Sequence, residues 1–167
     1  MMKKLTLLFL TIGFIGLSTY ETKAQALGTN YQNAIGGRFG VANGITFKHF
    51  MNERDALDFI LNFRAKKNQY SSFRLVGLYE IHNPIANAAG LQWYYGIGAG
   101  IGSYTYKGNQ SNKDSNVYLS VDGVLGLDYK FNGAPINIAL DWKPSFDISP
   151  DQGLDFEGVG LSIRFAF

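Results

Sequence analysis

Apolar and polar residues alternate one by one along the last nine residues of the chain. One set of alternate positions holds Val159, Leu161, Ile163, Phe165 and Phe167, and the other holds Gly160, Ser162, Arg164 and Ala166. Successive side chains of a β-strand point to opposite faces of a sheet, so this period of two predicts a strand with one apolar and one polar face. A helix would bring residues three or four apart onto one face and would mix the two sets.

The same alternation recurs in five segments upstream. These are residues 57–64, 73–82, 91–102, 117–131 and 136–143. Residues 27–167 contain no apolar run as long as the roughly 20 residues that a membrane-spanning helix needs. We therefore predict an all-β protein, and its length of 167 residues favours one domain.

The apolar faces carry many large side chains. The sequence has 13 Phe, 10 Tyr and 2 Trp, and side chains of this total volume would not fit inside a small barrel. It has no cysteine, which excludes a disulfide framework and thiol catalysis. A soluble barrel or sandwich turns its apolar face inward, whereas a membrane barrel turns it to lipid and encloses the polar face. The pattern favours the membrane barrel; a soluble periplasmic lipid-binding barrel is the alternative.

The strand count follows from parity, because single-chain bacterial barrels have even numbers of strands. Residues 34–41 and 45–51 would form a further hairpin, with its turn at Ala42-Asn43-Gly44, since Asn-Gly is a strong hairpin signal. This predicts an eight-stranded antiparallel up-and-down transmembrane β-barrel; one long kinked strand over 34–50 is the alternative. We expect a tight turn at residues 132–134 on the periplasmic side, and external loops at residues 107–115 and 148–155.

Residues 1–26 have the layout of a cleaved signal peptide, which leaves 27–167 as the barrel domain. Lys3 and Lys4 precede an apolar stretch that ends at Leu17, and cleavage is expected after Ala24 or Ala26. Removing this segment leaves 12 basic and 12 acidic residues, because it contains three of the 15 Lys and Arg and one of the 13 Asp and Glu. A neutral mature chain has no electrostatic footprint for nucleic acid.

The polar faces predict a network of paired charges inside the barrel, because charges survive in an apolar environment only when they are paired. The predicted members are Arg38, Lys48, Asp58, Arg64, Arg74, Glu80, Asp122, Asp128, Lys130, Asp141, Lys143 and Arg164. At about eight strands, such side chains fill the lumen. The expectation is a plugged interior rather than an open channel.

The mature chain resembles the small porin-like outer-membrane β-barrels of Gram-negative bacteria. The resemblance rests on the C-terminal segment 161–167, on Gly77-Leu78-Tyr79-Glu80-Ile81-His82-Asn83-Pro84 with Trp93-Tyr94-Tyr95-Gly96, and on Leu140-Asp141-Trp142-Lys143-Pro144. It implies an outer-membrane location after export, contact with outer-membrane lipids and lipopolysaccharide, and recognition of the assembly signal Ile163, Phe165 and Phe167 by the barrel-insertion machinery. It implies no single activity, because family members include adhesins, anchors and enzymes.

No motif predicts catalysis, a cofactor or a metal. His49 and His82 are the only histidines, and the predicted topology puts both toward the periplasm, away from the outer leaflet where lipid A-modifying barrels work. The alternating glycines of residues 96–102 fit a strand better than a nucleotide loop. Asp147, Asp151, Asp155 and Glu157 are a weak candidate for a divalent cation. The prediction is a monomeric structural or interaction protein; the alternatives are a narrow passive pore and a lipid-modifying enzyme.

Overall fold

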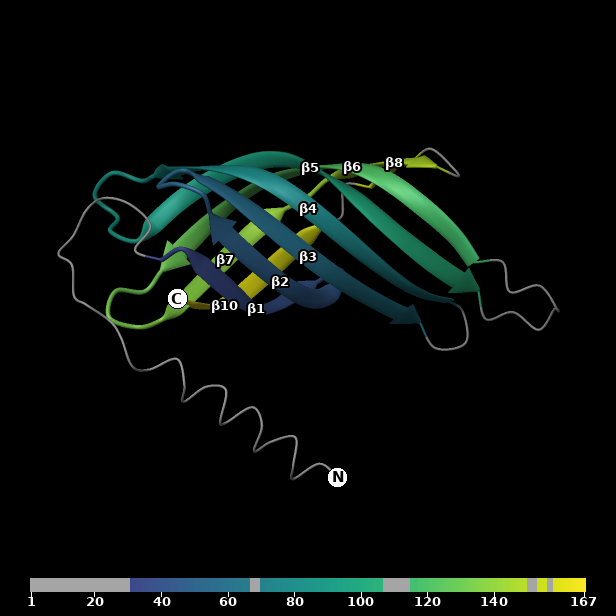
Figure 1. Ribbon diagram of the computed structural model, residues 1–167, viewed down its shortest axis with the longest axis horizontal. Helices are drawn as coiled ribbons and strands as arrows, with labels where there is room; N and C mark the ends of the chain where they lie inside the picture. The colour runs from purple at the N-terminus through teal and green to yellow at the C-terminus, as the bar shows by residue number, and fades with distance from the viewer. Residues whose placement is uncertain (1–30, 67–69, 107–114, 150–152, 156–157) are drawn as a thin grey trace, which may run out of the picture.

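A computed structural model of the chain describes residues 31–66, 70–106, 115–149, 153–155 and 158–167. These residues form ten β-strands (Figure 1): β1 Asn33–Gly40, β2 Asn43–Phe50, β3 Asp55–Lys66, β4 Tyr70–Pro84, β5 Leu91–Tyr106, β6 Ser115–Lys130, β7 Ile136–Trp142, β8 Ser145–Ser149, β9 Gly153–Asp155 and β10 Val159–Ala166. None of the described residues belongs to a helix long and apolar enough to cross a membrane.

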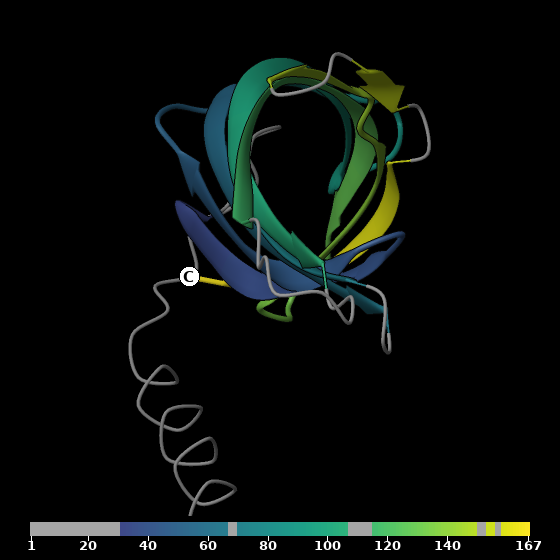
Figure 2. The same ribbon diagram turned by 90° about the vertical axis from the view of Figure 1, so that its right-hand side faces the viewer.

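The ten strands build a closed antiparallel barrel of eight strands. Each strand from β1 to β6 pairs with the next one along the chain. The seventh barrel strand is β7 continued by β8, since both pair with β6, and the eighth is β9 continued by β10. The pairing of β1 with β10 closes the ring, which Figure 2 shows nearly end-on. The predicted fold class is confirmed.

The first hairpin is real, but its turn is not where the Asn-Gly signal places it. β1 and β2 pair in an antiparallel register in which Arg38 lies opposite Gly44, so the alternative of one kinked strand over 34–50 is wrong. The turn residues are Val41 and Ala42, and Asn43 already belongs to β2. Gly40 enters the turn with a φ of 152°, a conformation that glycine adopts without strain.

The predicted external loop at 148–155 is partly wrong. Residues up to Ser149 continue the barrel wall as β8, and Gly153–Asp155 return as β9, so only residues 150–152 separate the two strands. Pro144 interrupts the wall between β7 and β8, because proline has no N–H to give to the ladder. Its carbonyl still accepts a hydrogen bond from Gly123 N at 2.9 Å, which keeps the interrupted strand attached to β6.

We name the two ends of the barrel by the position of the chain termini. We call the end where Tyr31 and Phe167 lie the terminal end; the turns after β2, β4 and β6 are on this side, including the predicted turn at residues 132–134. The opposite end, where β5 finishes and β6 begins, is the far end. Figure 1 shows both ends, with the C-terminus marking the terminal one.

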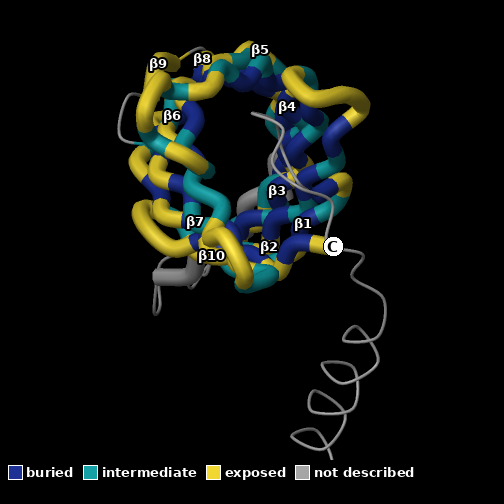
Figure 3. The backbone as a smooth tube through the Cα atoms, turned by 90° about the vertical axis from the view of Figure 1, so that its left-hand side faces the viewer, coloured by how far each residue is buried: buried dark blue, intermediate teal, exposed yellow. Residues whose placement is uncertain are grey.

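Burial is reversed relative to a soluble protein. Along β10, every second residue is exposed and apolar while the residues between are buried, and Arg164 is only 2% exposed where Ile163 is 45% exposed. The same alternation runs around the ring (Figure 3). The large apolar side chains therefore cover the outside, and the charged ones fill the inside.

Candidate functional site in the barrel interior

The largest buried charge cluster lies toward the terminal end of the lumen. We define the terminal-end cluster as Lys48, Asp58, Glu80, Asp128 and Arg164, which come from five different strands. The ammonium nitrogen of Lys48 is 2.7 Å from Glu80 Oε2, 3.4 Å from Asp128 Oδ2 and 3.9 Å from Asp58 Oδ2. One cation thus contacts three carboxylates from three different strands.

Arg164 is the second cation of this cluster and is also fully buried. Its Nη2 donates to Asp58 Oδ2 at 2.7 Å, its Nε donates to Thr46 Oγ1 at 3.1 Å, and its Nη1 donates to Asn137 Oδ1 at 3.2 Å. Charge-assisted bonds of this kind are the strong ones in a low-dielectric interior. The guanidinium therefore ties β10 to β2, β3 and β7.

A separate ion pair lies nearer the far end. Arg38 donates both terminal nitrogens to Asp141, at 2.5 and 2.6 Å, in the bidentate geometry that suits a guanidinium and a carboxylate. The hydroxyl of Tyr94 donates to the same carboxylate at 3.2 Å. Both charged side chains are almost fully buried.

A third group lies closest to the far end and consists of Arg74, Asp122 and Lys143, which we call the far-end cluster. Asp122 Oδ1 accepts from Arg74 Nη2 and from Lys143 Nζ, each at 2.8 Å. Ser120 Oγ donates to Asp122 Oδ2 at 2.8 Å, and Ser145 Oγ accepts from Arg74 Nη1 at 3.3 Å. Two cations thus surround one buried carboxylate.

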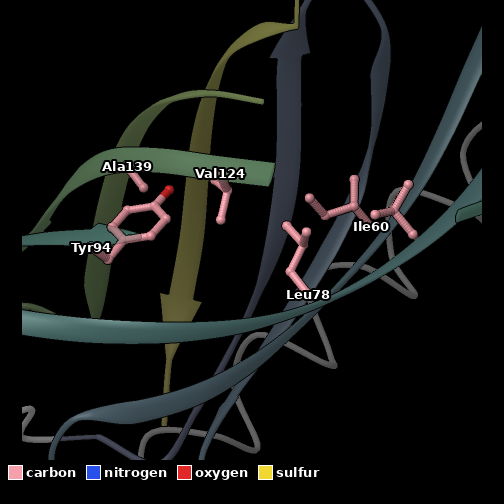
Figure 4. Packing of buried hydrophobic residues seen from close by; sticks show 6 residues of the cluster. Ile60, Leu78, Tyr94, Val124 and Ala139 are labelled. Atoms are coloured by element: carbon pink, nitrogen blue, oxygen red, sulfur yellow. The ribbon is translucent and has the colours of Figure 1, made fainter. Parts of the chain in front are cut away.

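Apolar side chains separate these charged groups along the strands. On β4, Val76 and Leu78 lie between Arg74 and Glu80, and on β6 Val124 lies between Asp122 and Asp128. They pack in one buried cluster, shown in Figure 4: Ile60, Val76, Leu78, Tyr94, Val124 and Ala139. On β4 and β6 apolar side chains therefore separate the far-end cluster from the terminal-end cluster, and the Arg38–Asp141 pair lies beside them, bonded to Tyr94.

Aromatic rings pack inside the terminal end. Tyr31 and Phe50 pack edge to face at 5.1 Å in a buried cluster with three alanines, and Phe50 packs on the His82 ring at 4.8 Å. His82 in turn stacks on Tyr94 at 4.8 Å. The four rings form a continuous column from the terminal mouth to the apolar cluster.

The structure places most of the predicted charges in these groups, with two exceptions. Lys130 sits at the end of β6, where its Nζ donates to the carbonyls of Phe131 and Ala134 and so caps the turn instead of joining the lumen clusters. Lys130 belongs to the polar set of alternate positions, as predicted, but it is next to a turn and therefore lies at the rim of the barrel. Arg64 belongs to β3, and its side chain lies outside the described residues.

The two histidines have different surroundings. His82 is fully buried, with Nε2 3.1 Å from Glu80 Oε2 and Nδ1 3.1 Å from Gln92 Oε1. His49 is half-buried and lies 2.8 Å from Asn33 Oδ1. Both lie toward the terminal end of the barrel.

The predicted network named charged residues only and so left out the neutral members of the interior. Thr46, Asn137, Ser120 and Ser145 satisfy the buried charges through hydrogen bonds. Their alternation with outward apolar residues is visible in the sequence, and it is the signal that would have included them. For a metal, the described residues contain no group of three His, Cys, Asp or Glu side chains that could hold an ion. Asp151 and Glu157 of the suggested cation site lie outside the described residues.

A closed eight-stranded barrel with an apolar exterior and a paired, charged interior defines the class of small transmembrane β-barrels. Solved structures with this fold include the N-terminal β-barrel domain of Pseudomonas aeruginosa OprF, with a TM-score of 0.63 at 15% identity over 84% of this chain and 99% of that one. Another is Neisserial surface protein A (NspA), with a TM-score of 0.53 at 9% identity over 81% of this chain and 93% of that one. The resemblance in fold to small outer-membrane barrels is confirmed. No family model and no curated protein sequence matches the chain.

Proposed function

We propose that the chain is a small integral outer-membrane protein with a structural or interaction role and a lumen closed by its own side chains. The observation that carries this proposal is the reversed burial: Phe39, Ile97 and Leu140 are each at least half exposed, while Lys48 and Asp122 are 0% exposed. Such a surface is stable only against hydrocarbon, because a soluble monomer rarely exposes large contiguous apolar patches. Export by way of residues 1–26 would deliver the chain to that location.

The partners we propose follow from the outer surface. The apolar belt fits lipid acyl chains, and outer-leaflet lipopolysaccharide would surround the far end. Ile163 and Phe165 on β10 and Phe167 after it are exposed on the outside of the barrel, and we propose that the barrel-insertion machinery recognises these three side chains. Truncating or changing these three residues should lower the amount of folded protein in the membrane without changing the amount synthesised.

The filled interior argues against the alternative of a pore. An ion entering from the far end would meet the paired charges of the far-end cluster, then the apolar side chains of Ile60, Leu78 and Val124 with the Arg38–Asp141 pair beside them, and then the terminal-end cluster. Every step would displace a buried side chain or break an ion pair. Eight-stranded barrels in general have an interior just wide enough for side chains to fill.

Planar-bilayer recording of the purified barrel tests this proposal. We expect no steady single-channel steps from the native protein. Large steady steps from the native barrel would overturn the closed-lumen proposal and favour the pore.

An unboiled gel tests the barrel and its location separately. A closed barrel in detergent should migrate differently before and after boiling, and the folded form should fractionate with outer membranes. A chain that stays monodisperse in buffer without detergent would contradict the membrane proposal and favour the soluble lipid-binding barrel.

For the enzyme alternative, the lipid A mass profile of a deletion strain should equal that of its parent.

A further inference from the structure

The seam between the first and last strands carries two arginines that both reach past the neighbouring strand. Arg38 on β1 pairs with Asp141 on β7, although β10 lies between these two strands. Arg164 on β10 donates to Thr46 on β2, although β1 lies between them, and continues to Asp58 on β3. Each arginine thus reaches across the adjacent strand to a partner on a strand beyond it.

A glycine lies on the path of each crossing. Gly160 lies opposite Asp141 in the ladder between β10 and β7, and a Cβ at Gly160 would lie 2.4 Å from both Cζ and Nη2 of Arg38. The guanidinium therefore occupies the space of the missing side chain. Gly36 lies opposite Arg164 on one side and opposite Thr46 on the other, so the Arg164–Thr46 hydrogen bond runs over Gly36.

The arrangement is reciprocal. β1 supplies one arginine and one glycine, and β10 supplies the matching glycine and arginine. The two ion pairs, Arg38–Asp141 and Arg164–Asp58, join residues that are 103 and 106 positions apart in the sequence. The hairpin of β1 with β2 and the pairing of β7 with β10 bring none of these partners together; only closure of the seam does. The two ion pairs thus form in the same event that completes the ring.

We infer that Arg38 and Arg164 act as a reciprocal lock on the β1–β10 seam, which keeps this seam from opening sideways in the finished barrel. In an open seam Arg38 and Asp141 would lose each other, and Arg164 would lose Asp58 and Thr46 and keep only Asn137 on β7 and Asp128 on β6. Separating a buried charge from its partner is costly. The lock makes the seam a permanent wall and excludes it as a lateral exit for membrane-soluble molecules. The inference does not depend on the proposed location, because it concerns the barrel in any membrane-like solvent.

Backbone amides of the two seam strands provide a built-in reporter. Asn33 and Phe167 exchange both backbone hydrogen bonds across the seam, so the alternation of an antiparallel ladder directs odd-numbered amides of β1 and β10 across the seam. Even-numbered amides face the other neighbour, as the bond from Ala166 N to Pro135 O shows. Hydrogen exchange of alternate amides on one strand therefore separates seam opening from loosening of the whole strand.

The experiment is residue-resolved hydrogen exchange by NMR on the detergent-folded barrel and on Gly160→Ala. The added methyl displaces the Arg38 guanidinium, and we expect faster exchange at the amides of Leu161 and Ile163 while those of Ser162 and Arg164 stay protected. Gly77→Ala is the matched control, because a Cβ there meets only the Phe59 ring at an ordinary 3.6 Å. Equal acceleration of odd and even amides, or no acceleration at either, would overturn the lock.

A charge swap keeps the test decisive if Gly160→Ala does not fold. In the double variant Arg38→Asp with Asp141→Arg, the new arginine on β7 can cross Gly160 in the opposite direction. We expect the swapped barrel to keep the protection of Leu161 and Ile163 that the single variant Arg38→Asp loses. Loss of seam protection in the swap despite a folded barrel would contradict the inference.

Discussion

The ammonium group of Lys48 on β2 lies 2.7 Å from the carboxylate of Glu80 on β4, across the intervening strand β3. Both side chains are at most 1% exposed, so neither charge has water to stabilise it. Three carboxylates and two cations share the terminal-end cluster. Removing one cation from this group leaves an uncompensated charge, whereas removing one cation together with one anion does not.

Lys48→Met is therefore expected to destabilise the barrel by about 3–5 kcal/mol, the usual cost of breaking one half of a buried pair. The double variant Lys48→Met with Glu80→Met removes the pair and keeps the net charge of the remaining cluster, so it should recover much of that loss. Denaturant unfolding in detergent, followed by the fluorescence of Trp93 and Trp142, measures both. A double variant no more stable than the single one would contradict this account.

The apolar cluster leads to a second prediction. Leu78 is 2% exposed and packs inside the lumen, whereas Leu75 on the same strand faces outward and is 45% exposed. Leu78→Ala leaves a cavity and should cost about 2–5 kcal/mol, while Leu75→Ala in detergent should cost clearly less because detergent fills the space. The same unfolding assay compares the two variants. Equal losses would mean that the interior is not packed around Leu78.

The faces of the strands were predictable from the sequence because a period of two requires no knowledge of the partner strand. Ile163 and Arg164 must point to opposite sides in any sheet. The contacts were not predictable in the same way. Lys48 meets Glu80, and Arg38 meets Asp141, only because the register and tilt of a closed ring bring strands together that are not neighbours, and no local pattern encodes either quantity.

The two errors in the loops have a related cause. Residues 148–155 contain proline, glycine and acidic residues, a composition typical of a loop. β6 is long, however, and offers hydrogen-bonding groups beyond β7, so Ser145–Ser149 pair with it and pull Gly153–Asp155 into a hairpin. In the first hairpin, the partnership of Gly44 with Arg38 and Asn62 keeps Asn-Gly inside β2. Tertiary pairing overrides local turn preference at both places.

The outward position of Leu140 gives a third prediction. Leu140 lies in the middle of β7, is 52% exposed, and pairs with Leu161 and Leu127 in a row of outward leucines. Arginine at this position would face hydrocarbon, so Leu140→Arg should cost about 2–4 kcal/mol when the barrel folds into lipid vesicles. Leu140→Phe is the matched control and should fold as the native chain does. Full folding yield of the arginine variant in vesicles would mean that this face does not contact lipid.

The hydroxyl of Tyr94 gives the fourth. Tyr94 is fully buried and stacks on His82. The centroid of its ring is 4.3 Å from Lys48 Nζ, and its hydroxyl donates a hydrogen bond to Asp141. Tyr94→Phe keeps the ring contacts and removes one hydrogen bond to a carboxylate that Arg38 already satisfies, so the loss should be about 1–2 kcal/mol. Tyr94→Leu removes the ring contacts as well and should lose distinctly more in the same unfolding assay. If both substitutions cost the same, the stacked ring contributes nothing beyond its hydroxyl, and the aromatic column does not stabilise the terminal end of the barrel.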